Sequence, residues 1–354
     1  MTGKFGAAGR LRWGWFIGFA LVLALAPLAT ESGTPTLLCI WALFALSLGL
    51  MWGYAGILSF GHAAYFGLGA YTYAITAMNT GESTAAFLLA LIVPAFVAAV
   101  LGAMMFYGRI SDVYMGVITL VVTLILFKFM NQTAGDAYRI GAARLGGFNG
   151  IPAFPILNVP GDTSLTIHGT PFYYVTIVCL LGCYLLSRWI LSSSFGRVLI
   201  GIRENEVRAE LLGYNAPAYK TAIFTVSAAM AGLAGCLFAN WAEIVTPTVF
   251  SLGQSAEVII WVVAGGLGTL VGPMLGAAVL GMLKLLLGSQ TLIDNSLVLG
   301  VILILVVLLV PRGLAPAFAA WRERSGRPGT PRQAGAATRR RQRGARKAES
   351  PESP

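Results

Sequence analysis

The sequence predicts an all-α integral membrane protein, a polytopic bundle of about eight to ten transmembrane helices that includes glycine-rich broken helices. Hydrophobic residues make up 57% of the 354 residues and charged residues only 11%, whereas a soluble domain carries about 25% charged residues. A water-soluble fold of this size would lack the polar groups to cover its surface, but a bilayer accepts an apolar surface. The 43 glycines fit the same class, because small residues let transmembrane helices approach closely.

Apolar runs long enough to cross the core of a bilayer set the number of spans. The segment 254–287 is apolar throughout but is broken by several glycines and Pro273, so two helices are expected there. If the bends at 53–61 and 265–273 are re-entrant rather than full crossings, ten spans become eight. The clear runs are Trp13–Thr30, Leu37–Trp52, His62–Met78, Ala85–Tyr107, Val113–Met130, Phe172–Leu191, Thr221–Trp241 and Leu297–Val310.

Basic residues place both ends of the chain in the cytoplasm, because cytoplasmic loops of membrane proteins are enriched in Lys and Arg. With an even number of spans and a cytoplasmic N-terminus, 20 of the 24 basic residues fall on the inner side. The first run could also be a signal peptide, but Pro27 after Ala24-Leu25-Ala26 disfavours cleavage. The inner segments are then 1–12, 108–112, 188–220 and 312–354.

The C-terminal segment 316–354 is expected to be a basic, disordered cytoplasmic tail, and 13–315 to be the membrane domain. The tail is rich in Gly, Ala, Ser, Pro and Arg, a composition that cannot bury a core. Its basic run, Arg339–Lys347, has no interleaved aromatic residues. We therefore expect contact with anionic membrane lipid rather than with nucleic acid.

The segment 131–170 is expected to form a periplasmic loop between two spans. Loops of this length are usually functional or disordered, and its apolar residues argue against complete disorder. A cap over an outer vestibule, a docking surface for a periplasmic partner and a plain ordered loop all remain open. Its glycine-rich turn, which permits unusual backbone angles, supplies the candidate residues Gly146, Gly147, Asn149 and Gly150.

The segment 192–220 is expected to be a charged helical element in the cytoplasm. Glu204 and Arg208 are spaced for an i, i+4 ion pair, and Gly213 with Pro217 is expected to end the helix. Two interpretations are open: an amphipathic helix on the membrane surface, or a lever that docks on a cytoplasmic motor subunit. The mixed charge favours docking. The candidate residues are Arg197, Arg203, Glu204, Glu206, Glu210 and Gly213.

Catalytic and metal-binding patterns are missing from the sequence. There is no Gly-x-x-x-x-Gly-Lys-Ser/Thr phosphate loop, no His-Glu-x-x-His and no Gly-x-Ser-x-Gly motif. The four cysteines lie in apolar runs and there are only two histidines, so no disulfide framework or metal site is expected. We therefore expect a path for a solute rather than an enzyme, with no catalytic residue, metal or cofactor.

Residues 53–72 read GYAGILSFGHAAYFGLGAYT, and this stretch resembles the LivM-type permease subunits of branched-chain amino acid ATP-binding-cassette importers. Further stretches agree with that family in order and spacing, and together they cover most of 37–315. They are the turn 146–152, the segment 195–215, the helix 227–235, the segment 257–276 and the ending 311–314.

The resemblance implies a bacterial inner-membrane subunit that forms a pore with a second, homologous permease. Two cytoplasmic ATP-binding subunits would drive it, and a periplasmic substrate-binding protein would deliver the amino acid; 195–215 would contact an ATP-binding subunit. Urea and short-amide permeases share this architecture, and Trp52-Gly53-Tyr54 and Val258–Trp261 are similar to that branch. An ATP-independent secondary transporter is the alternative from another class.

The glycine-rich bends are the candidate translocation path, because non-helical backbone at membrane depth must be buried in protein or line a wet cavity. Half-helix N-termini would suit a substrate carboxylate. For the glycines, close helix contact is an equal alternative; Ser59 could instead be an N-cap and His62 a helix start near the cytoplasmic interface. Glu257 could be solvated or paired with Lys284. The candidate residues are Ser59, Gly61, His62, Tyr71, Thr119, Thr123, Gln254, Glu257, Trp261, Gly266 and Gly268.

Overall fold

The computed structural model describes residues 32–135, 137–288 and Gly300. The chain divides into two units, Met1–Ala315 and Pro316–Pro354, and every described residue belongs to the first.

Some predicted segments lie outside the described residues. They are the N-terminal segment 1–12, the first span 13–30, the last span 297–310 apart from Gly300, and the basic tail 316–354. The number of spans, the cytoplasmic position of the two ends and the disorder of the tail therefore stay predictions.

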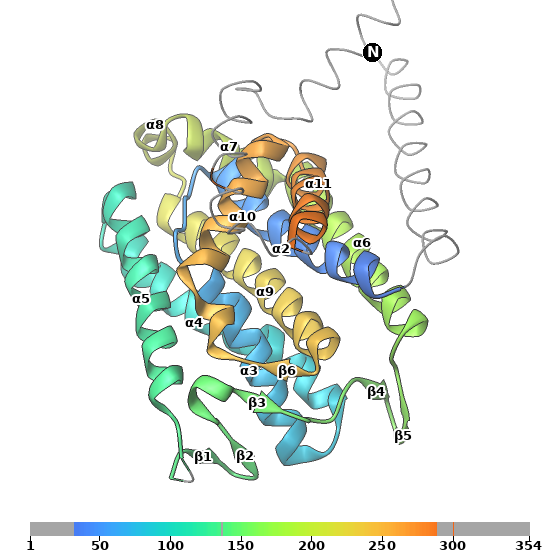
Figure 1. The fold of residues 1–354 in the computed structure, drawn as a ribbon. Helices are drawn as coiled ribbons and strands as arrows, with labels where there is room; N and C mark the ends of the chain where they lie inside the picture. Colours follow the sequence, from blue (N-terminus) through green and yellow to red (C-terminus); the bar gives the residue numbers. More distant parts are fainter. Residues whose placement is uncertain (1–31, 136, 289–299, 301–354) are drawn as a thin grey trace, which may run out of the picture. The chain divides into compact units, whose positions relative to one another are not determined.

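Helices make up most of the described chain (Figure 1). They are α2 (Gly33–Ala55), α3 (Ala63–Thr80), α4 (Ser83–Tyr107), α5 (Asp112–Gln132), α6 (Thr170–Ser192), α7 (Ser194–Glu204), α8 (Glu206–Leu211), α9 (Ala216–Ala242), α10 (Leu252–Gly265) and α11 (Val271–Gly288). Among the described residues, α2, α4, α5, α6 and α9 are long and apolar enough to cross a membrane, and α10 and α11 are shorter apolar helices. The predicted class, an all-α polytopic membrane protein, is confirmed.

Short strands and 3₁₀ helices occupy the connections. The strands are β1 (Arg139–Ile140), β2 (Ala143–Arg144), β3 (Ile151–Pro152), β4 (Asn158–Val159), β5 (Asp162–Thr166) and β6 (Ile244–Val245), and the 3₁₀ helices are η2 (Gly147–Asn149) and η3 (Pro247–Phe250). The strands form three antiparallel pairs, β1 with β2, β3 with β6 and β4 with β5. The pair β3–β6 joins the segment after α5 to the connection between α9 and α10.

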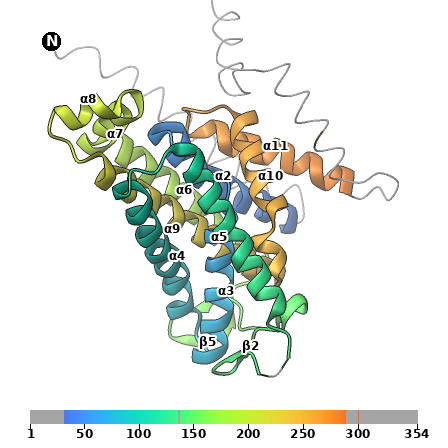
Figure 2. The same cartoon turned by 90° about the vertical axis from the view of Figure 1, so that its left-hand side faces the viewer.

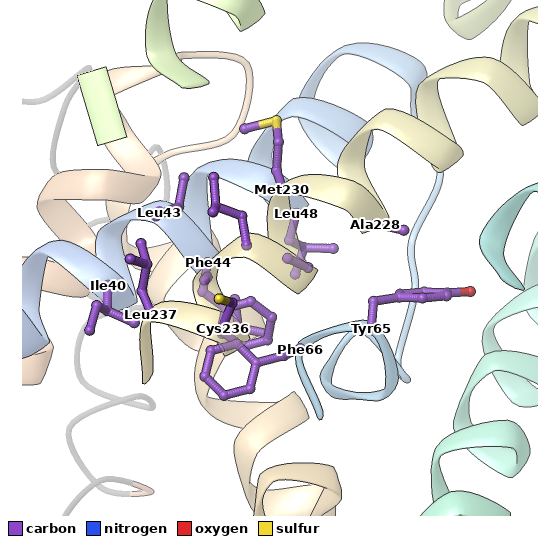
Figure 3. Close-up of a cluster of buried hydrophobic side chains, with 14 of the residues drawn as sticks. Ile40, Leu43, Phe44, Leu48, Tyr65, Phe66, Ala228, Met230, Cys236 and Leu237 are labelled. Atoms are coloured by element: carbon purple, nitrogen blue, oxygen red, sulfur yellow. The ribbon is translucent and has the colours of Figure 1, made fainter. Parts of the chain in front are cut away.

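Helix α2 is the buried centre of the bundle. Its sequence is apolar on all sides, as in helices that are buried in protein or span a membrane, and most of its residues are buried in the protein. It packs against α6, α9, α10 and α11. Figure 3 shows one part of this core, where Phe44 of α2 lies near Phe66 of α3 and Leu237 of α9. The ring centroids of Phe44 and Phe66 are 4.7 Å apart.

Small residues set the close packing of α3, α4 and α9. A Cβ atom on Gly69 of α3 would overlap the backbone of Gly232 in α9, and one on Gly232 would lie 2.5 Å from the carbonyl oxygen of Ala90 in α4. Glycine permits this approach because it has no side chain. On the opposite side, α4 exposes apolar side chains at Leu88, Ile92, Phe96 and Met104, as expected of a helix that faces lipid.

The two long polar segments lie at opposite ends of the helices (Figures 1 and 2). The strands β1–β6 gather at one end, which we call the strand end. Helices α7 and α8 lie at the other, which we call the α7–α8 end. The assignment of 131–170 to the periplasm and of 192–220 to the cytoplasm rests on the positive-inside rule and stays a prediction.

Candidate functional site

The connection between α2 and α3 turns back into the bundle. Helix α2 ends at Ala55, residues 56–62 are not helical, and α3 begins at Ala63. The Nε2 atom of His62 lies 2.8 Å from the hydroxyl of Ser47, which is eight residues before the end of α2. At 1.5 Å per residue, His62 therefore lies roughly 12 Å inside the bundle from that helix end. We call residues 56–62 the inner break.

Three helices enclose the inner break. On the α5 side, the hydroxyl of Thr123 donates to the carbonyl of Gly61 at 2.9 Å, and a Cβ on Gly61 would overlap the carbonyl of Thr119. On the α10 side, the amide of Ala63 donates to the hydroxyl of Ser255 at 3.4 Å. With α2 on the third side, Ser59, Gly61 and His62 are buried in protein, the condition under which a membrane tolerates non-helical backbone, while Gly56 and Phe60 are exposed.

The inner break carries buried polar atoms that have no partner among the described residues. The hydroxyl of Ser59 and the Nδ1 atom of His62 are both in this state, and their residues are 0% and 1% exposed. A buried polar group left without a hydrogen bond costs roughly 1–3 kcal/mol. Such groups indicate that a water or a solute supplies the missing partner. The structure therefore brings the predicted residues Ser59, Gly61 and His62 together with Thr119 and Thr123.

Two expectations for this segment are wrong. Ser59 is not a helix N-cap: the N-cap position of α3 is His62, whose side chain makes no capping hydrogen bond. His62 does begin a helix, but it does not lie near an interface. It is buried, with its ring stacked on Phe44 at 5.5 Å between centroids and set edge-on to Tyr65 at 5.9 Å.

Tyr71 lies two and a half turns further along α3, toward the strand end. Its ring stacks on Phe250 of η3 at 5.5 Å between centroids, and its buried hydroxyl has no described hydrogen-bond partner. Nine residues separate it from His62, a rise of roughly 13 Å along a helix. Tyr71 therefore sits apart from the inner break and packs against the connection between α9 and α10.

The second predicted bend lies between α10 and α11, and we call residues 266–270 the outer break. Gly266 and Gly268 have φ angles of +107° and +82°, which favour glycine. The hydroxyl of Thr269 donates to the carbonyl of Gly266 at 3.2 Å and accepts from the amide of Gly272 at 3.1 Å. The amide nitrogen of Gly268 lies 3.0 Å from the position of a Cβ on Gly53, near the end of α2. Gly266 and Gly268 are thus at the end of α2 and not beside His62.

Glu257 and Lys284 form the expected ion pair between α10 and α11. Their charged atoms lie 2.5 Å apart, and the side chains are only 18% and 28% exposed. The alternative of a freely solvated Glu257 is therefore wrong. The ammonium of Lys284 also lies 5.4 Å from the ring centroid of Trp41, which packs on Trp261 at 5.3 Å. Gln254 is half-buried at the start of α10, and only its backbone amide makes a described bond, to Ser251 at 3.2 Å.

The segment 192–220 contains two short helices, as expected, but Asn205 separates them. Asn205 has extended backbone angles and caps α8 by accepting from the amide of Arg208 at 2.8 Å. Glu204 and Arg208 are therefore on different helices, and the predicted i, i+4 pair is wrong. Pro217 begins α9 rather than ending the segment, because proline suits the first turn of a helix. Gly213, with φ of +90°, lies in the turn before α9.

The acidic residues of α8 bind basic residues of other elements instead. Glu206 pairs with Lys220 of α9 at 2.6 Å. Glu210 pairs with Arg109, which lies between α4 and α5, at 3.6 Å.

The arginines of α7 also bind elsewhere. Arg197 donates to the carbonyl of Ser192 at 3.1 Å, and Arg203 donates to the carbonyl of Gly53 at 2.5 Å. The apolar residues Val207 and Leu211 of α8 are exposed, so one face of this element is free among the described residues.

The predicted glycine turn at 146–150 packs closely against neighbouring elements at the strand end. Gly150 has a φ of +71°, and a Cβ there would overlap the carbonyl of Val245 in β6. A Cβ on Gly147 would lie 2.7 Å from Ala134, just after α5. Gly146 has a φ of +70°, and Asn149 is exposed. This part of the chain is an ordered loop that ties α5 to the α9–α10 connection.

Sequence reasoning missed two serines that bond to the start of α3. The hydroxyl of Ser47 bonds to the ring of His62, and that of Ser255 accepts from the amide of Ala63. Each is buried within a helix whose other buried residues are mostly apolar. A serine within an otherwise mostly apolar helix is the signal that could have found them.

Comparison with known proteins identifies the family of the chain. The sequence profile of the family described as the permease component of branched-chain amino acid transport systems matches residues 33–310. The chain is 28% identical to the high-affinity branched-chain amino acid transport system permease protein LivM of Escherichia coli K12, over 85% of this chain and 74% of that protein. It is 23% identical to the probable branched-chain amino acid transport permease protein LivM of Methanocaldococcus jannaschii, over 78% of this chain and 90% of that protein.

A second kind of relative matches part of the chain. The permease protein LivH of the high-affinity branched-chain amino acid transport system of Salmonella typhimurium is 29% identical over 43% of this chain and 49% of that protein. No solved structure matches the chain at a significant level. Because the family profile covers most of the sequence, this chain belongs to the family of permease components of branched-chain amino acid transport systems.

Proposed function

We propose that the chain is one of two homologous permease subunits of an ATP-binding-cassette importer that carries branched-chain amino acids across a bacterial inner membrane. Two ATP-binding subunits on the cytoplasmic side and a periplasmic binding protein complete the proposed assembly. The match to relatives named LivM and to others named LivH supports a pair of permeases. The observation that carries the transport role is the inner break, with its buried polar atoms that lack partners.

The inner break offers chemistry that suits an amino acid. The N-terminus of α3 starts at His62 and Ala63, inside the bundle, and a helix N-terminus favours a negative charge such as a carboxylate. The Ser59 hydroxyl and the His62 Nδ1 atom are each available for one hydrogen bond. The surrounding side chains, among them Phe44 and Tyr65, supply apolar surface for an aliphatic substrate.

Energy for transport comes from other subunits in this proposal, because the sequence has no phosphate-binding loop of the P-loop type. The free face of α8, with Val207 and Leu211 exposed beside charged residues, fits a protein partner on the cytoplasmic side. The mixed charges, Glu206 and Glu210 among them, favour a protein surface over anionic lipid.

Uptake of labelled leucine and labelled urea by cells with and without this chain tests the proposal. We expect the chain to support leucine uptake that stops when cellular ATP is depleted and continues when the proton gradient is dissipated with ATP maintained. Uptake of urea instead of leucine would overturn the substrate class. Leucine uptake that follows the ion gradient would overturn the importer class.

A further inference from the structure

The end of α2 is a junction of three parts of the chain. The guanidinium of Arg203, from α7, donates to the carbonyl of Gly53 at 2.5 Å. The amide of Gly268, from the outer break, lies against Gly53 on another side. The inner break begins at Gly56, where a Cβ would lie 3.2 Å from the Cγ atom of Arg203. A movement of α7 would therefore act on residues that adjoin both the inner break and the outer break.

The bond from Arg203 to Gly53 gives a hydrogen-bond donor to a carbonyl at the end of α2. Gly53 is among the last residues of α2, whose carbonyls have no partner within the helix. The C-terminus of a helix carries a partial negative charge, which favours a cation. A hydrogen bond from a guanidinium is about twice as strong as one between neutral groups. Arg203 therefore holds the end of α2 more firmly than a neutral side chain would.

Other charged residues of α7 and α8 do not make this connection. Arg197, on the same helix, bonds to Ser192, the last residue of α6. Glu206 and Glu210 bind basic residues of α9 and of the α4–α5 connection. One turn before Arg203, Leu199 is fully buried in the main core, so this face of α7 is directed inward. Among these contacts, the Arg203 bond is the one that reaches the start of the inner break.

We infer that Arg203 is a positioning residue that passes movement of α7 and α8 to the inner break through the carbonyl of Gly53. Helices α7 and α8 expose one face to a partner and hold the end of α2 with the other. When the partner moves them, the start of residues 56–62 moves with Arg203, and the polar groups of Ser59 and His62 change their access to solute. This inference rests on the proposed function, which supplies the moving partner.

The test uses the assembled importer in lipid vesicles, with Arg203→Ala, Arg203→Lys and the control Lys128→Ala, which removes an exposed basic side chain of α5. ATP hydrolysis and leucine uptake are measured together. A second readout is the labelling of Leu58→Cys, in the inner break, by a thiol reagent with and without ATP, corrected for the same chain without that cysteine.

We expect Arg203→Ala to hydrolyse ATP at a rate near that of the unaltered importer but to take up about tenfold less leucine per ATP, the effect of losing one charge-assisted bond. Labelling of Leu58→Cys should stop responding to ATP. Arg203→Lys keeps the charge and should recover part of both the uptake and the labelling response, and Lys128→Ala should behave as the unaltered importer.

Two results would overturn the inference. One is Arg203→Ala with uptake and labelling equal to those of Lys128→Ala. The other is loss of ATP hydrolysis along with uptake in Arg203→Ala, which would assign Arg203 to assembly of the complex. Failure of the unaltered importer to couple ATP to uptake would instead contradict the proposed function, so the two failures are distinguishable.

Discussion

The inner break and the outer break come from the same kind of sequence, yet they differ in what the structure does with their polar groups. At the outer break, Thr269 bonds to the carbonyl of Gly266 and to the amide of Gly272, and Gly268 is exposed. At the inner break, Ser59 is buried and its hydroxyl has no partner among the described residues. A glycine-rich bend therefore indicates where a helix stops, while the state of the polar groups distinguishes a hinge from a solute site.

The largest expected effect comes from adding one methyl group to the inner break. In Gly61→Ala the new Cβ would overlap the carbonyl of Thr119 and the hydroxyl of Thr123. Overpacking of this kind costs about 1–3 kcal/mol, and here it also displaces the segment that we assign to substrate. We expect leucine uptake to be lost and the amount of folded protein in membranes to fall.

The matched control for that change is Gly182→Ala in α6, where the added Cβ has no atom within 4 Å. This variant should transport and accumulate normally. Normal uptake by Gly61→Ala would mean that the segment has room to move and that its close contact with α5 has no role.

Removing the free hydroxyl of the inner break should impair transport without loss of stability. Ser59→Ala deletes a group that makes no described internal hydrogen bond, so the melting temperature should stay the same or rise. A hydrogen bond to a charged ligand is worth roughly 1.5–3 kcal/mol, so leucine uptake at limiting substrate should fall by about tenfold or more.

Ser187→Ala in α6 is the control for Ser59→Ala, because Ser187 is equally buried but its hydroxyl already donates to the carbonyl of Cys183 at 2.8 Å. Uptake should be unchanged in that variant. Equal uptake by both variants would show that the free hydroxyl of Ser59 does not meet the substrate.

The ion pair between Glu257 and Lys284 should support the helices that flank the outer break. Glu257→Gln leaves Lys284 charged and mostly buried without its partner, and we expect a loss of about 1–3 kcal/mol in stability. The double variant Glu257→Gln with Lys284→Met should lose less stability than Glu257→Gln alone. Thermal unfolding in detergent measures this, and additive effects of the two changes would argue against a stabilising pair.

The smallest expected effect is at the outer break itself. Thr269→Ala removes the side chain that bonds to Gly266 and Gly272, at a cost of about 1 kcal/mol, typical of a lost cap. Stability should fall slightly while the substrate concentration for half-maximal uptake stays the same. A change in that concentration, absent from the control Thr225→Ala in α9, would make the outer break part of the substrate site.

Much of the fold follows from local sequence, because hydropathy and the positions of glycine and proline act within one helix length. Helix α6 (Thr170–Ser192) lies within two residues of the predicted run, and both breaks are where glycines indicate them. The pairing of Glu257 with Lys284 is one of two alternatives that the sequence leaves open, and the structure selects it over a solvated Glu257.

The depth of each residue could not be predicted, because it depends on contacts between distant parts of the chain. His62 is placed by Ser47 and Phe44 of α2, and Gly61 by Thr123 of α5. The stop at Asn205 was missed for a local reason: its side chain caps the next helix, a role that competes with continuing the previous one.

The most direct test of the central claim is protection of the inner break by substrate. Ser59→Cys and the control Thr269→Cys, each in the assembled importer, are reacted with a thiol reagent with and without leucine. We predict that leucine slows the labelling of Ser59→Cys and leaves that of Thr269→Cys unchanged. Labelling of Ser59→Cys that is unaffected by leucine, in an importer that still transports it, would contradict the claim that the substrate passes the inner break.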